Sequence, residues 1–216
     1  MFLFTNENID KIKGITYTNE PIPEKKQGRI EYSQNEGILK DFNYSRFKVK
    51  SFPKNASMRT YSELMFLRDL PEDKEFVEKH DKIEDVFREV CKDYNVEYPE
   101  ELVNELIKSS SGIILDLKYH YNRPRPKQLA KEYGFEIGGI ELESMSSPSY
   151  PSGHSTQGIL IGKVLQTKLP ITTDAFLQAG KRISYSRNVG RAHFPSDSEM
   201  GELLGSEMFK FLRHRI

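Results

Sequence analysis

The stretch from residue 99 to residue 126, PEELVNELIKSSSGIILDLKYHYNRPRP, contains the clearest structural pattern in the chain. Apolar side chains recur in it at spacings of three and four, at Val103, Leu106, Ile107, Ile114 and Leu117. This spacing predicts a helix from Pro99 to about Tyr121 with one buried face. The run Arg123-Pro124-Arg125-Pro126 must end that helix, because proline lacks an amide donor and disfavours helical geometry in the residue before it.

Apolar residues at helical spacing also occur on both sides of this stretch. We expect helices in residues 61–70, 72–94, 153–168, 173–189 and from Ser196 to the C-terminus, with a loop over 127–150. Ser196 with Glu199 three residues later forms a capping-box pattern. Residues 1–57 differ, because they are rich in Pro, Gly and Asn and contain β-leaning pieces such as GITYT and RFKVKSF. The prediction is an all-α bundle, with an irregular lead-in over 1–57 and a single helical domain over 58–216.

The composition excludes several classes of function. With 32 basic and 32 acidic residues, the chain has no net charge and lacks the broad basic face that binding to a nucleic acid polymer requires. No apolar run approaches the roughly 20 residues that span a bilayer. The first residues, MFLFTNENIDKIKG, lack the basic start and long apolar centre of a secretory signal, so we expect a cytoplasmic protein. The single cysteine, Cys91, excludes an intramolecular disulfide and is expected in the core.

The first piece with chemical meaning is KYHYNRPRP, which runs from Lys118 to Pro126. Lys118 lies near the end of a predicted helix, and Arg125 follows on a proline-stiffened exit. Two cations are thereby aimed at one place, where they could bind phosphate oxygens. The alternative is a solvated basic helix terminus.

The second piece, YPSGHS, precedes a periodic apolar run, so its amides would lie at a helix N-terminus, which attracts anions. Gly153 permits close approach of the backbone, Ser152 adds a hydroxyl donor, and His154 would face the same ligand. The alternative is an ordinary Ser N-cap with a surface histidine.

The third piece, SRNVGRAHFPSD, ends one helix and begins another. His193 lies in the turn, and Asp197 follows four residues later. A carboxylate there can bind one imidazole nitrogen and leave the other free to attack phosphorus, while Arg187 would supply a third cation. The alternative is a hydrogen bond at a helix start without catalysis.

Together the pieces read Lys-x6-Arg-Pro, Pro-Ser-Gly-His and Ser-Arg-x5-His-x3-Asp. With this signature, the sequence resembles the type 2 phosphatidic acid phosphatase superfamily, which includes bacterial class A acid phosphatases and vanadium haloperoxidases. The resemblance covers Lys118 to Asp197 closely, and a segment such as SYPSGH resembles the soluble class A enzymes more than the membrane-embedded lipid phosphatases. It implies the helical bundle of that superfamily.

The resemblance also implies a mechanism without a metal or another cofactor. Lys118, Arg125, Arg187, Ser152 and Gly153 would hold the phosphoryl group of a soluble phosphomonoester, such as a nucleotide or sugar phosphate, and vanadate could take its place. His193 would attack phosphorus, with Asp197 orienting it, and His154 would act as general acid and then as general base.

Other readings stay open at this point. The same pocket could serve a vanadate-dependent haloperoxidase, or a noncatalytic module that binds phosphate or a nucleotide. Arg123 is either a second-sphere residue or a contact to the substrate tail, and His120 either lines the pocket or has no role. His80 and His214 lie in charged helical segments and are expected to be solvated. An exposed apolar helix stripe would favour a homodimer.

Overall fold

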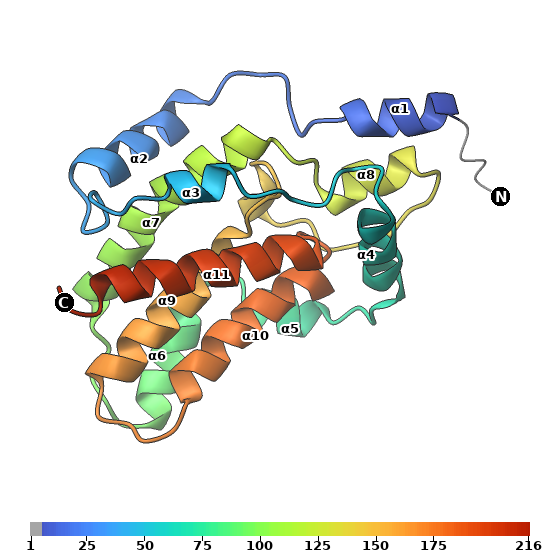
Figure 1. Cartoon of the computed structure of the whole chain (residues 1–216). Helices are drawn as coiled ribbons and strands as arrows, with labels where there is room; N and C mark the ends of the chain where they lie inside the picture. Colours follow the sequence, from blue (N-terminus) through green and yellow to red (C-terminus); the bar gives the residue numbers. More distant parts are fainter. Residues whose placement is uncertain (1–5) are drawn as a thin grey trace.

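The computed structural model describes residues 6–216, and this part of the chain contains helices and no strand (Figure 1). The elements are α1 (Asn6–Gly14), α2 (Glu24–Asn35), α3 (Ser45–Lys48), α4 (Met58–Asp69), α5 (Lys74–Lys79), α6 (Ile83–Asp93), α7 (Glu100–Tyr121), α8 (Pro126–Glu132), the 3₁₀ helix η1 (Glu143–Met145), α9 (Gly153–Lys168), α10 (Ala175–Val189) and α11 (Pro195–Leu212). The all-α prediction is confirmed.

Helix α9 lies at the centre of the bundle, where it packs against α7, α10 and α11 (Figure 1). The principal core cluster draws fully buried side chains from these helices and from α6, such as Phe87, Leu106, Leu160, Phe176 and Leu204. Helix α11 approaches α9 closely at Gly201, where an added Cβ would lie 2.5 Å from the Ser152 carbonyl oxygen. A side chain at Gly201 would therefore push against the start of α9.

The expected long helices are present, and local signals explain their ends. Helix α7 ends at Tyr121 because Asn122 adopts a left-handed conformation and donates its amide to the Lys118 carbonyl, one residue before the Arg-Pro repeat. Helix α9 begins where the Ser152 side chain accepts the Ser155 amide. Cys91 is buried, as expected.

The predicted capping box of the last helix is wrong. Helix α11 begins at Pro195, and the side chain that accepts an amide at its start is Asp197, from Phe194 at 2.9 Å. Glu199 instead pairs with Arg59 at the surface. Proline is favoured at the first helical position because its missing amide has no partner there in any case.

The prediction of an irregular lead-in is also wrong, because residues 6–57 contain α1, α2 and α3. Helix α2 packs along α7, where the Ser33 hydroxyl accepts the Gly112 amide at 3.0 Å and Ile30 is buried. This tertiary contact overrides the weak local preference of the segment. Helix α4 begins at Met58, but the division into a lead-in over 1–57 and a single helical domain over 58–216 stays a prediction.

Two further differences lie close to the site. The expected loop over 127–150 contains α8, which has Pro126 at its first position and the Gln128 side chain accepting the Arg125 amide at 2.8 Å. The expected helix over 72–94 is broken into α5 and α6. His80 follows α5 and is buried, with Nδ1 2.7 Å from the Phe76 carbonyl oxygen, so the expectation that it is solvated is wrong.

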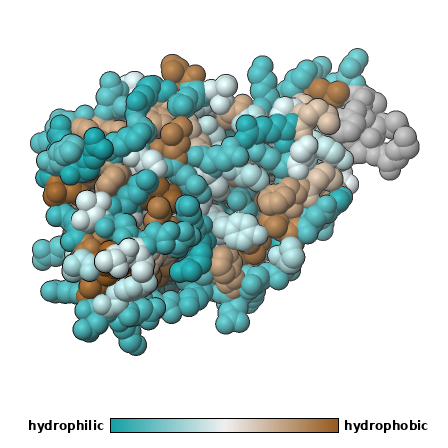
Figure 2. All heavy atoms as spheres, turned by 60° about the horizontal axis from the view of Figure 1, so that its bottom comes forward, coloured by the Kyte–Doolittle hydropathy of each residue, from teal (hydrophilic) through white to brown (hydrophobic). Residues whose placement is uncertain are grey.

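The surface in Figure 2 is mostly hydrophilic, and its apolar residues form small separate groups. The exposed large apolar side chains of residues 6–216 are Val49, Met58, Phe66, Tyr94, Tyr185 and Leu203. In the same residues, no helix is both long enough and apolar enough to cross a membrane. The prediction that the chain lacks a secretory signal rests on residues 1–14, and residues 1–5 lie outside the part that the structure describes. The homodimer stays a prediction.

Candidate active site

The three sequence pieces meet at one end of the bundle. Lys118 comes from the end of α7, Arg125 precedes α8, and Arg187 lies near the end of α10. Burial lowers the pKa of the His154 imidazole at the start of α9, and the charges of these three cations lower it further. The side chains of Lys118, Arg125 and Arg187 are nearly or fully buried. The site is therefore an enclosed cluster of positive charge, which attracts an anion.

His193 is held at both ring nitrogens. Its Nδ1 lies 3.3 Å from Asp197 Oδ2, and its Nε2 lies 3.1 Å from Arg125 Nη1. A guanidinium can only donate, so Nε2 must accept, and the proton belongs on Nδ1 facing the carboxylate. Burial, followed by the charges of Arg125 and Lys118, sets the pKa of His193 well below its ordinary value. The ring is therefore neutral, with its lone pair on Nε2, which is the form a nucleophile needs.

Asp197 is fully buried and hydrogen-bonded on both oxygens. Oδ2 accepts the Phe194 amide at 2.9 Å and the Ser149 hydroxyl, and Oδ1 accepts Arg123 Nη1 at 2.5 Å. Burial would raise the pKa of this carboxyl, but the charge of Arg123 and the hydrogen bonds from His193 and Ser149 outweigh it and lower the pKa. Asp197 thus stays ionised and fixed.

The donors of Lys118 and Arg125 face main-chain carbonyls. Lys118 Nζ donates to Pro148 at 2.6 Å, while Arg125 donates from Nε to Ser147 at 2.9 Å and from Nη1 to Ala192 at 2.7 Å. Burial lowers the pKa of Lys118, and it lowers that of Arg125 to about 10. Neutral carbonyls do not neutralise these positive charges, and the carboxylate that acts on both groups is Asp197, so the pair favours binding of an anion.

The start of α9 provides the remaining predicted residues. Ser152 is the N-cap, as the alternative reading had it, and its amide donates to the Asp197 carbonyl at 2.9 Å. Gly153 lies beside Lys118, since an added Cβ would lie 4.0 Å from Lys118 Cε. His154 is not the surface residue of that alternative, because only 16% of its side chain is exposed.

A family model for the PAP2 superfamily matches residues 103–215, which is just over half of the chain. The chain belongs to the PAP2 superfamily. All eight predicted site residues lie inside the matched range, and the structure brings them together. Membership points to hydrolysis of phosphoesters, and it confirms the superfamily resemblance. The particular similarity to class A acid phosphatases stays a prediction.

The structure decides the two residues that the sequence left open. Arg123 is fully buried and lies behind the PAP2 motif residues, where Nη1 donates to Asp197 and to Ser196 Oγ at 2.8 Å. Its guanidinium is thus paired with buried polar side chains and does not face solvent. His120 is exposed, and its Nε2 lies 3.0 Å from the Lys48 carbonyl oxygen.

Sequence reasoning missed two carboxylates outside the matched PAP2 segment. Glu63, from α4, accepts Arg123 Nη2 at 3.4 Å and the Ser196 hydroxyl at 2.8 Å. Asp81, from the turn between α5 and α6, accepts Arg187 Nη1 at 2.7 Å. Glu63 lies in a stretch expected to be helical and Asp81 in a strongly charged one, and no local signal in the sequence separates them from their neighbours.

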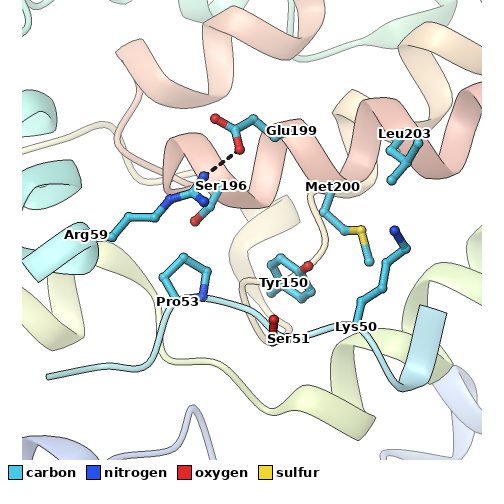
Figure 3. A pocket seen from close by; sticks show the side chains of 9 residues that line it. All are labelled: Lys50, Ser51, Pro53, Arg59, Tyr150, Ser196, Glu199, Met200 and Leu203. Atoms are coloured by element: carbon cyan, nitrogen blue, oxygen red, sulfur yellow. Dashed lines mark hydrogen bonds and ion pairs between the residues drawn. The ribbon is translucent and has the colours of Figure 1, made fainter. Parts of the chain in front are cut away.

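A cavity of about 420 Å³ lies between the segment of residues 50–53 and the first half of α11 (Figure 3). None of the eight predicted residues lines it. Ser196 forms part of its wall, and the Arg59–Glu199 ion pair closes one side. The cavity therefore opens onto the outer end of the Glu63–Arg123 network. In residues 6–216, no group of three or more His, Cys, Asp or Glu side chains is placed to hold a metal ion.

Proposed function

We propose that the protein is a metal-independent acid phosphatase that hydrolyses soluble phosphomonoesters through a phosphohistidine on His193. One observation carries this proposal: the neutral Nε2 of His193 faces Arg125 inside a cluster of three buried cations, while Nδ1 is held by Asp197. Simple anion binding needs the cations alone and gains nothing from an oriented imidazole. The arrangement therefore favours catalysis over a noncatalytic binding module.

In the first step, Lys118, Arg125 and Arg187 exchange their present partners for phosphoryl oxygens, and the Gly153 amide adds a donor. The lone pair of His193 Nε2 forms the nitrogen–phosphorus bond. The ester bond breaks in line with it, and the leaving oxygen takes its electron pair. Charge neutralisation by the three cations stabilises the transition state.

His154 supplies the proton that the leaving oxygen requires. Its Nε2 lies 2.9 Å from the Asp81 carbonyl oxygen, which only accepts, so Nε2 keeps its proton and Nδ1 carries the transferable one. In the second step, neutral His154 takes a proton from water as the water attacks the phosphohistidine. Phosphate leaves, and His193 returns to its neutral form.

The charge balance favours an acidic optimum. Burial and then Arg187 lower the pKa of His154 in the ligand-free site. A bound phosphate dianion adds negative charge beside the ring, which raises that pKa and favours the protonated acid. His193 must meanwhile stay neutral, so the pH profile of kcat/KM should be bell-shaped in the acidic to neutral range.

The test measures release of an aryl alcohol from an aryl phosphate in excess chelator, in the intact protein and in His193→Ala. His214→Ala is the control, because His214 is exposed near the C-terminus. Activity that survives chelation, falls with vanadate and disappears only in His193→Ala supports the proposal, and a nucleotide and sugar-phosphate panel then identifies the substrate. Equal activity in both variants would exclude His193 as the nucleophile. An inactive protein that brominates after vanadate loading would be a haloperoxidase.

A further inference from the structure

A carboxylate from outside the matched family segment reaches into the cation cluster. Asp81 lies in the turn between α5 and α6, and its Oδ1 accepts Arg187 Nη1 at 2.7 Å. The same oxygen lies 3.5 Å from His154 Nε2, and the Asp81 main-chain oxygen lies 2.9 Å from that nitrogen. Asp81 thus contacts both the guanidinium that would hold a phosphoryl oxygen and the histidine that would donate a proton.

These contacts have opposite effects on binding and on chemistry. A phosphoryl oxygen that binds Arg187 Nη1 must compete with the Asp81 carboxylate for the same donor. The two anions also repel each other, which weakens the binding of the ligand. The carboxylate next to His154, however, favours the positively charged imidazolium. One side chain therefore lowers anion affinity and supports proton donation.

We propose that Asp81 is a positioning residue that weakens anion binding at Arg187 and supports proton donation by His154. This inference rests on the proposed phosphatase function. The main-chain contact from Asp81 would orient the ring in any side-chain variant, so the carboxylate itself carries the two opposed effects.

The surroundings of His154 give the direction of the effect. Arg187 from α10, Lys118 from α7 and Arg125 before α8 all lower the pKa of His154, after burial has already done so. The carboxylate that lies next to the His154 ring is that of Asp81. The other buried carboxylate, Asp197, lies against His193 and Arg123. Loss of the Asp81 carboxylate would leave Arg187 uncompensated beside the ring, and the protonated form of His154 would become rarer.

The test compares Asp81→Asn with the control Asp85→Asn, which makes the same charge change at an exposed position in the first turn of α6. Vanadate affinity should increase about three- to tenfold in Asp81→Asn, because a competing anion is gone. The ratio of kcat/KM for an aryl phosphate to that for an alkyl phosphate should rise about tenfold, because only the poor alkyl leaving group depends on a proton. This ratio cancels any change in phosphate binding.

Asp81→Glu, which keeps the charge, should restore the aryl-to-alkyl ratio toward that of the intact protein, and it supplies the comparison if Asp81→Asn does not fold. The inference is overturned if Asp81→Asn behaves like Asp85→Asn, or if it binds vanadate more weakly and loses activity on both esters equally. An intact protein that neither binds vanadate nor hydrolyses either ester would instead refute the proposed phosphatase function.

Discussion

The buried charge network behind His193 makes Arg123 the side chain whose loss should have the largest effect on stability. Arg123 is fully buried, with Nη1 2.5 Å from Asp197 Oδ1 and Nη2 3.4 Å from Glu63 Oε2. Its guanidinium carbon lies 4.0 Å from the centre of the Phe194 ring. Arg123→Met keeps most of the apolar volume and removes the charge, so Asp197 loses its cation away from water and Glu63 keeps only Arg59.

The expected cost is about 3–5 kcal/mol in the free energy of unfolding, the range for removing one partner of a buried ion pair. That is a large fraction of the about 5–15 kcal/mol that stabilises a typical domain. Arg59→Met is a matched control, because Arg59 also contacts Glu63, at 3.3 Å, but its side chain is 55% exposed. A surface pair contributes about 0–1 kcal/mol, so the control should be nearly silent.

Urea unfolding of the two variants and the intact protein measures this difference, and turnover of an aryl phosphate is followed in the same samples. At urea concentrations at which Arg123→Met is folded, it should also hydrolyse the aryl phosphate about tenfold more slowly than the intact protein. The reason is that Asp197 loses the charge that keeps it ionised and fixed beside His193. If Arg123→Met is destabilised no more than Arg59→Met, Arg123 is not the counter-ion of Asp197, and our account of the network is wrong.

Three further predictions concern packing, protonation and orientation. Gly201→Ala should cost about 1–3 kcal/mol in urea unfolding, because its Cβ would lie 2.5 Å from the Ser152 carbonyl oxygen, whereas Gly28→Ala has open space and should cost nothing. Folding lowers the pKa values of the buried His154 and His193 below the ordinary 6.5, so the unfolded chain binds more protons than the folded one as the pH falls. The free energy of unfolding should therefore be highest above about pH 6.5. Below that pH it should fall by up to about 1.4 kcal/mol per pH unit for each histidine. A melting temperature that is constant from pH 7.5 to 5 would contradict this. Asp197→Asn should lower kcat at least about tenfold, and an unchanged kcat would show that His193 needs no orienting carboxylate.

Local sequence patterns determined much of this protein. Apolar spacing located the helices at 100–121 and 153–168, because one face of each must be buried and the period of the helix fixes which residues share it. The motif residues could be recognised for a similar reason. Each lies within a few residues of a helix end, so short spacings such as that between His193 and Asp197 translate directly into contacts.

The tertiary structure alone decided what surrounds those residues. The roles of Glu63, Asp81 and Arg123 depend on partners 60 or more residues away, and local spacing carries no information about such pairs. The break between α5 and α6 was hidden by a continuous helical pattern, and it places Asp81 against Arg187. Burial then determines how strongly each charge acts on its neighbours. A carboxylate that water would screen on an isolated helix has a strong electrostatic effect on neighbouring side chains inside a folded chain.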